Sequence, residues 1–429
     1  MLRRAFRSAL WVVLCGALAV PVQSQDSGRP DSGSPDSGTS DSNFGFSLPI
    51  TASGGAMYTR RGQYEDPGSS PVMGGFRIVL SPTVTLGQHW FFYAAEELHF
   101  TPYFYYDAYE PDHEWYVQAQ QAFVGYQIRR EKTSVVFKAG NLASAFGAFP
   151  LHYDDADNAL LDQPLSYTQY IGLRNDQLPC GVADLLGQNP FQVSNHCGGP
   201  SGADDGMTPV NLYGMPAIQA EVSSHRLDAR IQVASGSPSG PLSLSHAPQY
   251  AQWVAGGGYT IRQGFRVGIS GFRGPYLTPD VAAALPLGTS VRSFPASGLG
   301  LEAQWARGHW SVSGEWQRFQ YDYPGFTQAP SVISTYGEAK RILTPRFYVA
   351  GRAGWFKPGG AADASGASTS EFSPSIASYE LAGGWWVNRH QLLKASYEWL
   401  SIEHLPGTQN NVLGVQFVTT FHAIDQAFH

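Results

Sequence analysis

Charged residues are scarce in this chain, and long apolar runs are missing beyond its first residues. Only 14% of the 429 residues are charged, compared with about 25% in an average soluble domain. After the N-terminal stretch no segment approaches about eighteen consecutive apolar residues, which excludes membrane-spanning helices. The formal net charge of -7 argues against a nucleic-acid-binding surface.

Cysteine is also scarce, with three residues in the whole chain. Cys15 falls in the N-terminal signal described below, so Cys180 and Cys197 are the pair that remains after export. Both lie in one long connection, and in an oxidising compartment they most simply form a disulfide. The rival interpretation is a metal site that adds His196, but no fourth ligand has a helpful spacing. We therefore predict no metal and no cofactor.

The N-terminus has the form of an export signal. A basic start is followed by the apolar stretch Ser8–Val20, which is too short to span a bilayer as a helix. We place the cleavage site after Ser24, so that residues 1–24 form the signal peptide, with Ala17–Ala19 as the rival site. Most of residues 25–44 repeats Asp, Ser, Gly and Pro and is predicted to be a disordered tail. Residues 45–429 remain for the folded domain.

The segment between Trp310 and Trp316 carries the pattern that decides the fold class. Its even-numbered positions are Trp, Val, Gly and Trp, while its odd-numbered positions are Ser and Glu. A β-strand turns successive side chains to opposite faces, so this segment has one apolar, aromatic face and one polar face. Segments 347–355 and 393–399 repeat the pattern. Charge on one face with Trp and Tyr on the other is typical of a transmembrane β-barrel and not of a soluble sandwich.

About sixteen such strands follow one another from residue 46 onward, which predicts an all-β fold, a transmembrane antiparallel β-barrel. Short turns alternate with long connections, as in bacterial outer-membrane barrels with short periplasmic turns and long extracellular loops. Aromatic clusters near strand ends fit the girdles at the two membrane interfaces. The expected strands are 46–60, 72–86, 89–106, 115–129, 133–142, 212–223, 226–235, 249–261, 265–274, 297–306, 309–321, 331–342, 345–356, 375–387, 391–402 and 409–422. The aromatic clusters are Trp90–Phe92, Tyr103–Tyr106, Trp115–Tyr116, Trp355–Phe356 and Trp385–Trp386.

Charged residues on the polar faces are expected to point into the lumen, because each would cost a few kcal/mol if it faced lipid. A barrel of about sixteen strands leaves an aqueous channel, so the strand count indicates a pore. Both signs of charge are present, which argues against strong ion selectivity, and we expect most of these groups to pair across neighbouring strands. The lumen-lining candidates are Arg77, Lys138, Arg266, Glu302, Glu315, Glu338, Lys340, Arg346, Arg352, Lys394 and Glu398.

The longest connection, residues 143–211, follows the fifth expected strand, and we call it the third loop. It has apolar residues of its own and holds both cysteines, so it should be ordered, and a loop of this length usually has a function. We expect it to fold into the lumen and narrow it. A calcium site built from its aspartates is an alternative, but their spacing does not match the regular calcium-binding loop. The constriction candidates are Phe146, Phe149, Asp154, Asp155 and Asp157.

The entry to this loop carries a local resemblance to a known family. Val136–Leu142 followed by Phe146 and Gly147 resembles the phosphate-selective porin O/P-like family, in which a strand ending in a basic residue, Gly and a polar residue leads to Phe-Gly at the head of an inward loop. The resemblance implies a sixteen-stranded barrel, often a homotrimer, that passes small solutes by diffusion. This third loop lacks a run of Arg and Lys, so phosphate selectivity is not carried over. The usual terminal Phe is Phe428, one residue from the end.

Together these features predict an outer-membrane, porin-like channel for passive diffusion of small hydrophilic solutes, surrounded by outer-membrane lipid and lipopolysaccharide. The alternatives are a substrate-specific transporter, a barrel enzyme, and a structural or adhesive surface protein. We expect no enzyme, because Ser-Gly pairs such as Ser313-Gly314 lie within strands and not in the strand-to-helix elbow of a catalytic serine.

Overall fold

A computed structural model describes residues 44–64, 67–109, 113–210, 214–237, 240–241, 251–370, 372–403 and 411–428. The predicted signal peptide and nearly all of the predicted tail lie outside these residues. The described part of the chain holds no helix that is long and apolar enough to cross a bilayer.

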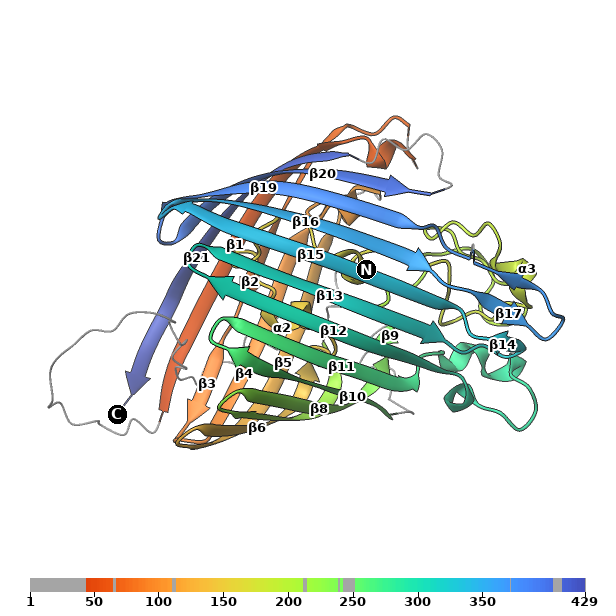
Figure 1. The fold of residues 1–429 in the computed structure, drawn as a ribbon, viewed down its shortest axis with the longest axis horizontal. Helices are drawn as coiled ribbons and strands as arrows, with labels where there is room; N and C mark the ends of the chain where they lie inside the picture. The colour runs from red at the N-terminus through yellow and green to blue at the C-terminus, as the bar shows by residue number, and fades with distance from the viewer. Residues whose placement is uncertain are drawn as a thin grey trace, which may run out of the picture.

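The chain forms a closed antiparallel β-barrel of sixteen strands, as the sequence predicted (Figure 1). Each strand pairs with the next along the chain, and the first and last strands close the ring through pairs that run from Phe44↔Phe428 to Thr59↔Val412. Two short strands, residues 72–80 and 83–86, together occupy one position in the wall. The first of them pairs with residues 50–58 of the N-terminal strand, and the second pairs with residues 44–47 of it. The barrel strands are β1 (Phe44–Thr59), β2 (Val72–Leu80) with β3 (Thr83–Leu86), β4 (Trp90–Phe100), β5 (Trp115–Arg130), β6 (Thr133–Leu142), β7 (Met215–Ser224), β8 (Leu227–Ser237), β10 (Ala251–Arg262), β11 (Phe265–Pro275), β12 (Pro295–Arg307), β13 (Trp310–Tyr321), β15 (Ser331–Thr344), β16 (Phe347–Pro358), β19 (Ile376–Asn388), β20 (Gln391–Ile402) and β21 (Val412–Phe428).

The remaining elements are short and belong to the connections. β14 (Phe326–Gln328), β17 (Ala361–Asp363) and β18 (Ser368–Thr369) form a small sheet at the long-loop end, and β9 (Gly240–Pro241) pairs with the end of β8. The helices are α2 (Phe149–His152) and α3 (Val182–Leu185), with 3₁₀ turns at Arg61–Tyr64, Tyr106–Tyr109, Leu165–Tyr167, Pro279–Ala284 and Val291–Ser293.

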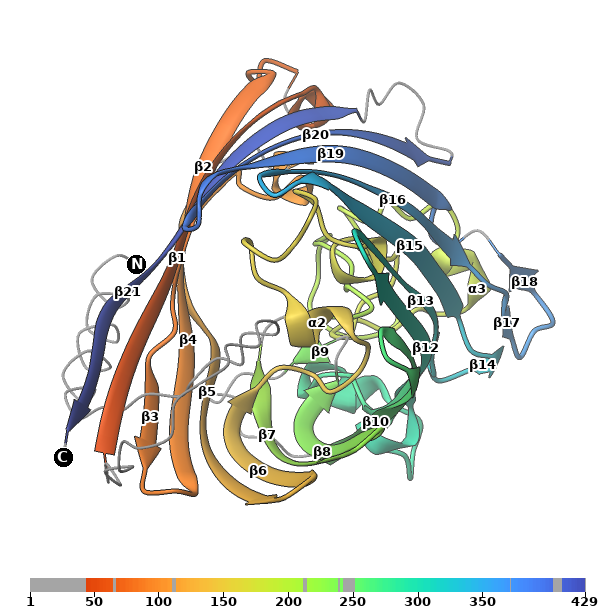
Figure 2. The same ribbon diagram turned by 60° about the vertical axis from the view of Figure 1, so that its left-hand side comes forward.

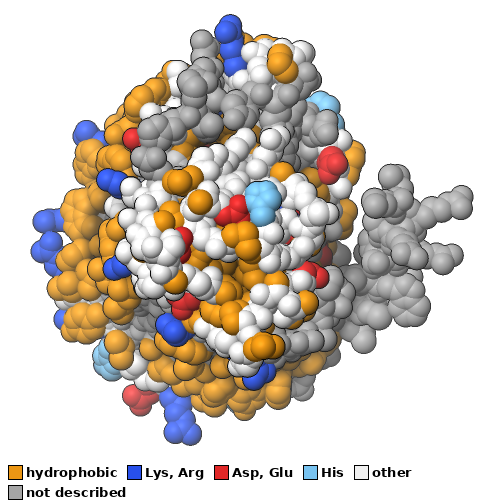
Figure 3. Space-filling view, turned by 90° about the vertical axis from the view of Figure 1, so that its right-hand side faces the viewer, with side chains coloured by type: hydrophobic (Ala, Val, Ile, Leu, Met, Phe, Trp, Pro, Cys, Tyr) orange, Lys and Arg blue, Asp and Glu red, His pale blue; other side chains and the backbone are white. Residues whose placement is uncertain are grey.

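The two faces of the wall differ as alternation requires. On β13, Trp310 and Val312 are exposed on the outer face, whereas Glu315 is buried on the inner face. The same outer face carries Trp253, Trp355, Trp385 and other exposed aromatic residues. Seen from the long-loop end, hydrophobic side chains follow much of the outline while polar side chains and backbone cover the centre (Figure 3). An apolar exterior around a polar interior is the arrangement that a lipid environment selects.

Several expected strand bounds were wrong. The strand expected over 72–86 is broken between Leu80 and Thr83, and the last strand runs on to Phe428. The strand expected over 89–106 ends at Phe100, and Tyr103, Phe104 and Tyr105 are buried inside the barrel instead of forming a girdle. Pro102 explains the break, because proline has no N–H to donate to a neighbouring strand. Within the clusters Trp90–Phe92 and Trp355–Phe356, the tryptophans are exposed, while Phe356 is fully buried.

The hairpin between β15 and β16 also differs from expectation. We had placed Arg346 on the polar face of a strand, but the turn falls at Pro345 and Arg346, where the Arg346 amide donates to the Thr344 hydroxyl (3.3 Å). Arg346 is therefore exposed at the short-turn rim and is not part of the lumen wall.

Candidate functional site

The third loop lies inside the barrel, where α2 sits within the ring of strands (Figure 2). Its entry is held by two inward side chains of β8. The Arg230 guanidinium donates to the carbonyl oxygens of Ala145 and Gly147, both at 2.8 Å. Gln232 accepts from the Ala145 amide (3.1 Å) and donates to the Ala143 carbonyl (2.9 Å). Irregular backbone at membrane depth needs such partners, because its polar groups cannot be left unpaired there.

Glu315 of β13 holds the next part of the loop. Its carboxylate accepts the amide protons of Ala148 (3.2 Å) and Phe149 (2.8 Å). It also accepts the hydroxyl protons of Tyr167 (3.0 Å), from the loop, and Tyr336 (2.8 Å), from β15. This predicted lumen residue is thus an anchor for the loop and is itself buried.

Wall charges of β16 and β20 hold the middle of the loop in the same way. Arg352 donates to the Asp162 carbonyl (2.8 Å) and pairs with Glu338 (2.8 Å). Lys394 donates to the carbonyls of Asp155 (2.8 Å), Asn158 (3.1 Å) and Leu160 (3.2 Å). Because charged side chains satisfy the loop backbone at several points, the loop occupies a defined position in the lumen.

The three aspartates of the loop have different surroundings. Asp155 is buried, pairs with Arg77 of β2 (2.9 Å), and accepts hydrogen bonds from Ser53 (2.7 Å) and Tyr103 (3.0 Å). Asp154 is half-buried and accepts the Ala156 amide proton (2.7 Å), whereas Asp157 is exposed. The Asp155 carboxylate is therefore not free to face a solute, although Asp155 was one of the predicted constriction residues. In the described chain no group of three or more acidic, His or Cys residues is arranged to hold a metal ion.

The other lumen candidates pair along the inner wall. Lys138 pairs with Glu221 (2.7 Å), Arg266 pairs with Asp228 (2.7 Å) and with Glu302, and the Lys340 ammonium lies over the Tyr348 ring (4.3 Å). Glu398 pairs with Arg61 (2.6 Å).

Sequence reasoning missed two further inward segments. One is the connection between β1 and β2, and the other is the connection between β4 and β5. Arg61 reaches from the first connection to Glu398, and its guanidinium also donates to the Tyr105 carbonyl (3.0 Å). Asp107 accepts the amide protons of Tyr103 (2.9 Å) and Phe104 (2.8 Å), which fixes the turn after β4. The proline at position 102, inside an apparent strand, was the signal that could have revealed the second of these segments.

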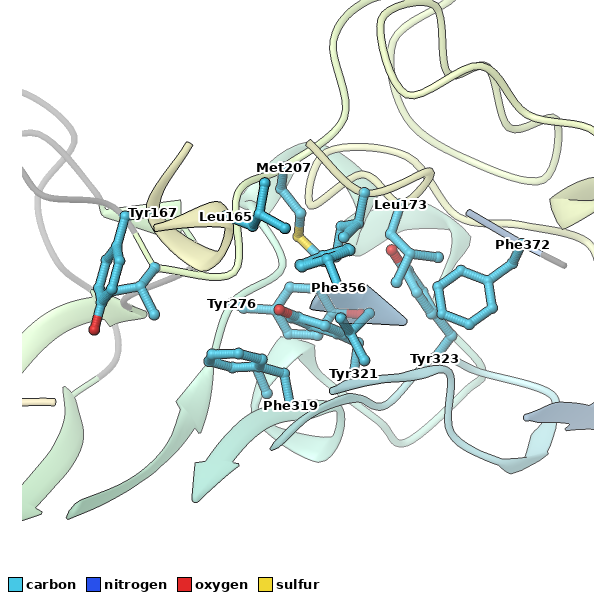
Figure 4. Packing of buried hydrophobic residues seen from close by; sticks show 14 of the residues in the cluster. Leu165, Tyr167, Leu173, Met207, Tyr276, Phe319, Tyr321, Tyr323, Phe356 and Phe372 are labelled. Atoms are coloured by element: carbon cyan, nitrogen blue, oxygen red, sulfur yellow. The ribbon is translucent and has the colours of Figure 1, made fainter. Parts of the chain in front are cut away.

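Apolar residues of the third loop and of the barrel wall form a core within the long-loop half of the barrel (Figure 4). Phe146 is fully buried there and packs edge-on against Phe272 (ring centroids 5.0 Å apart) and Phe319 (5.7 Å). Phe149 is only partly buried and lies beside Tyr167. Phe146 is thus an anchor in the core, and Phe149 is the aromatic constriction candidate that remains accessible.

The outer part of the loop is tied by the disulfide Cys180–Cys197, which confirms the predicted pairing. Asp184 lies between the two cysteines and accepts the amide protons of Cys180 (3.2 Å) and His196 (2.9 Å), as well as a contact from the His196 ring. Partial burial opposes ionisation of Asp184, but these hydrogen bonds outweigh it and lower the pKa of its carboxyl group.

Two cavities adjoin the inner part of the loop. One, of about 140 Å³, lies between the loop and the wall of β12, β13 and β15 and is lined by Phe149, Asp157, Gln304 and Glu338 among others. The other, of about 530 Å³, lies between the loop and the wall from β1 to β7. The loop thus has open space on two sides in a lumen whose walls carry charge.

Comparisons with known proteins support the fold and do not identify a family. No family model and no curated protein sequence matches the chain. Among solved structures, it resembles the outer membrane channel DcaP of Acinetobacter baumannii (10% identity, 89% of this chain and 99% of that chain, TM-score 0.55). It also resembles OmpT, an outer membrane protein of Vibrio cholerae (8%, 88% and 97%, TM-score 0.51), and OmpF of Salmonella typhi in complex with daunomycin (10%, 89% and 98%, TM-score 0.50).

At such low identity these likenesses concern the fold alone, a closed antiparallel β-barrel of the kind that these outer-membrane proteins have. They give no support to the narrower phosphate-selective family that the local resemblance indicated.

Proposed function

We propose that this protein is a porin-like channel of the outer membrane through which small hydrophilic solutes diffuse passively. The observation that carries the proposal is a closed sixteen-stranded barrel whose inner wall bears charge and whose third loop enters the lumen. Barrels of this strand number are wide enough for an aqueous channel. The short turns would face the periplasm and the long loops the exterior. The resemblance at Val136–Leu142 adds a homotrimer as the proposed assembly.

In this proposal the third loop sets the width of the passage. It is held by wall charges on β8, β13, β16 and β20, so it would act as a fixed constriction and not as a gate. Asp157 presents an exposed carboxylate to the smaller cavity beside it, whereas Glu338, which also lines that cavity, is paired with Arg352. Low-dielectric walls strengthen the field of such charges, so we expect a weak preference for cations. Asp155 would contribute little to it, because Arg77 balances its charge.

Conductance in planar bilayers tests the channel directly. The purified protein should give steady, ohmic conductance in KCl, and a variant with residues 157–164 replaced by a short Gly-Ser linker should conduct more. A matched variant carries the same linker in place of residues 283–289, in the long connection between β11 and β12, and should conduct like the parent. Steady conductance separates a porin from a gated, substrate-specific transporter. A folded barrel with no conductance would refute the proposal, and an unchanged conductance after the loop replacement would refute the constriction.

Replacing Asp157 by asparagine tests the selectivity. The reversal potential in a KCl gradient should move toward that of an unselective channel. Asp155→Asn is the control and should shift it less, and a larger shift for Asp155→Asn would contradict the assignment.

A further inference from the structure

The larger cavity has the character of a small-molecule site. It measures about 530 Å³ and lies between the third loop, at Ala143 and Pro150, and the inner wall of the barrel. Pockets that bind small molecules are commonly about 300–1,000 Å³, with apolar and aromatic walls and a few placed polar groups. This cavity has both kinds of lining, and neither serves to anchor the loop.

The aromatic side of the cavity is a row of three rings on β4 and β5. Phe91 and Tyr93 are alternate residues of β4, so both point inward, and Phe123 is the cross-strand partner of Tyr93. The Phe123 ring lies 6.0 Å from the Phe91 ring and 5.4 Å from the Tyr93 ring, centroid to centroid. We had expected Phe91 to belong to an interfacial girdle, but it faces the lumen. Covering these rings with a solute is favourable, because it removes apolar surface from the water of the channel.

Gly125 lets the row lie flat on the wall. It is the cross-strand partner of Phe91, and a Cβ atom at this position would come within 2.2 Å of the Phe91 ring. The Phe91 ring therefore lies over the glycine, with its opposite side toward the cavity. Glycine within a strand often marks such a close approach.

The polar side of the cavity is a compensated pair flanked by amides. Lys138 of β6 bonds to Glu221 of β7, with side chains 21% and 30% exposed. The Arg61–Glu398 pair, which helps to hold the inward segments, is 1% exposed at both residues. The Lys138 ammonium lies 5.5 Å from the Phe123 ring centre. The other polar side chains that line the cavity are Gln121, Gln219, Ser47, Thr83 and His422. The pair presents donors and acceptors but no net charge, so it favours neither anions nor cations.

We propose that this cavity is a subsite for a neutral sugar ring during passage through the channel, an inference that rests on the proposed function. One face of a pyranose consists of C–H groups, which would pack on the rings of Phe91 and Tyr93. Its hydroxyl groups both donate and accept, which matches the Glu221 carboxylate, the Lys138 ammonium and the glutamine amides. An ion would leave the aromatic row uncovered, and an apolar solute would cover the polar side of the cavity without forming hydrogen bonds to it.

The test is the effect of sugars on single-channel current. Glucose should reduce the KCl current of the open channel in a saturable way, whereas sorbitol, a linear polyol of similar size without a ring face, should change it only through bulk viscosity. Phe91→Leu and Tyr93→Leu should each weaken the glucose effect by about two- to tenfold, the range that a lost aromatic contact implies. Phe92→Leu is the matched control, because Phe92 is adjacent in sequence and faces outward with its partner Val124.

Each outcome is decisive. Equal effects of glucose and sorbitol, or an undiminished glucose effect in both the Phe91 and Tyr93 variants, would overturn the sugar subsite while leaving the channel intact. If the protein does not conduct, saturation-transfer NMR with glucose on the detergent-solubilised barrel still reports binding. A signal that is lost in the Phe91 and Tyr93 variants and kept in the Phe92 variant would support the subsite even if the channel proposal fails, and no signal would refute the subsite.

Discussion

Arg77 and Asp155 join the barrel wall to the third loop through a buried ion pair. The guanidinium of Arg77 lies 2.9 Å from the Asp155 carboxylate and 3.0 Å from that of Glu97, and the three side chains are 1–4% exposed. One cation on β2 therefore serves a neighbour in the wall and a residue of the loop. Pairs of this kind are costly to break, because the partner left behind is a buried charge without compensation.

Removing Arg77 should destabilise the protein more than neutralising Asp155. Arg77→Gln leaves two buried carboxylates without their shared cation and should cost about 3–5 kcal/mol of unfolding free energy. Asp155→Asn keeps the size of the side chain and leaves Arg77 paired with Glu97, so its cost should be smaller. Urea unfolding in lipid vesicles measures both. Lys138→Gln, at the more exposed pair, should cost at most about 1 kcal/mol, and an equal loss in all three variants would contradict this order.

An arginine on the outer face should be tolerated at the rim and not at mid-wall. Leu301 lies at the centre of β12 and is exposed outward, while Val312 is exposed only two residues from the short turn that precedes β13. Leu301→Arg should cost about 2–4 kcal/mol and Val312→Arg about 0–1 kcal/mol, since the cost of a charge in lipid falls toward the interface. Unfolding titrations in vesicles measure both costs. A larger cost at Val312 would mean that the membrane is placed differently on the barrel.

Truncation of the anchoring phenylalanine should loosen the third loop. Phe146 is fully buried between Phe272 and Phe319, so Phe146→Ala should cost about 3–5 kcal/mol. The loop would then leave its fixed position, and single-channel records should show frequent current fluctuations. Phe149→Ala removes a partly buried ring and should leave the current steady while raising it. Quiet current in the Phe146 variant would show that the loop does not depend on this anchor.

Acid should loosen the disulfide-linked part of the loop around Asp184. Its carboxyl pKa is lowered in the folded protein by hydrogen bonds from His196 and Cys180, after the opposing effect of partial burial. A carboxyl group with a lowered pKa stabilises the folded state fully at pH values above its unfolded-state pKa of about 3.9. This stabilisation is lost as the pH falls through the folded-state pKa. Amide hydrogen exchange at residues 180–197, corrected for intrinsic rates, should therefore be faster at low pH than at neutral pH. Asp184→Asn should remove most of this difference, and an unchanged difference would assign it to another group.

The barrel itself could be predicted from the sequence because the lipid face repeats along every strand. A period of two fixes which side chains point outward, as Trp310 and Glu315 illustrate. The same rule failed at Arg346, because alternation does not say where a strand ends. It could not separate Phe91 from Trp90 either, since both are apolar and only the register sends one inward.

The interior was predictable only in part, because it depends on contacts between distant segments. The disulfide followed from the presence of two cysteines in one exported connection. The path of the loop across the lumen decides that Asp155 meets Arg77 and that Glu315 accepts loop amide protons. No local sequence pattern encodes this path.

The pairing of β1 with β21 has a consequence for how the protein is made. Every other pair in the wall joins positions that follow one another along the chain, with β2 and β3 counted as one position, whereas this pair joins the first described strand to the last. Until the final strand is in place, β1 and β20 each have an unpaired edge, which lipid cannot satisfy. The ring can therefore close only after β21 has been synthesised, and a nascent barrel that lacks this one strand would be an open sheet that needs a protective partner.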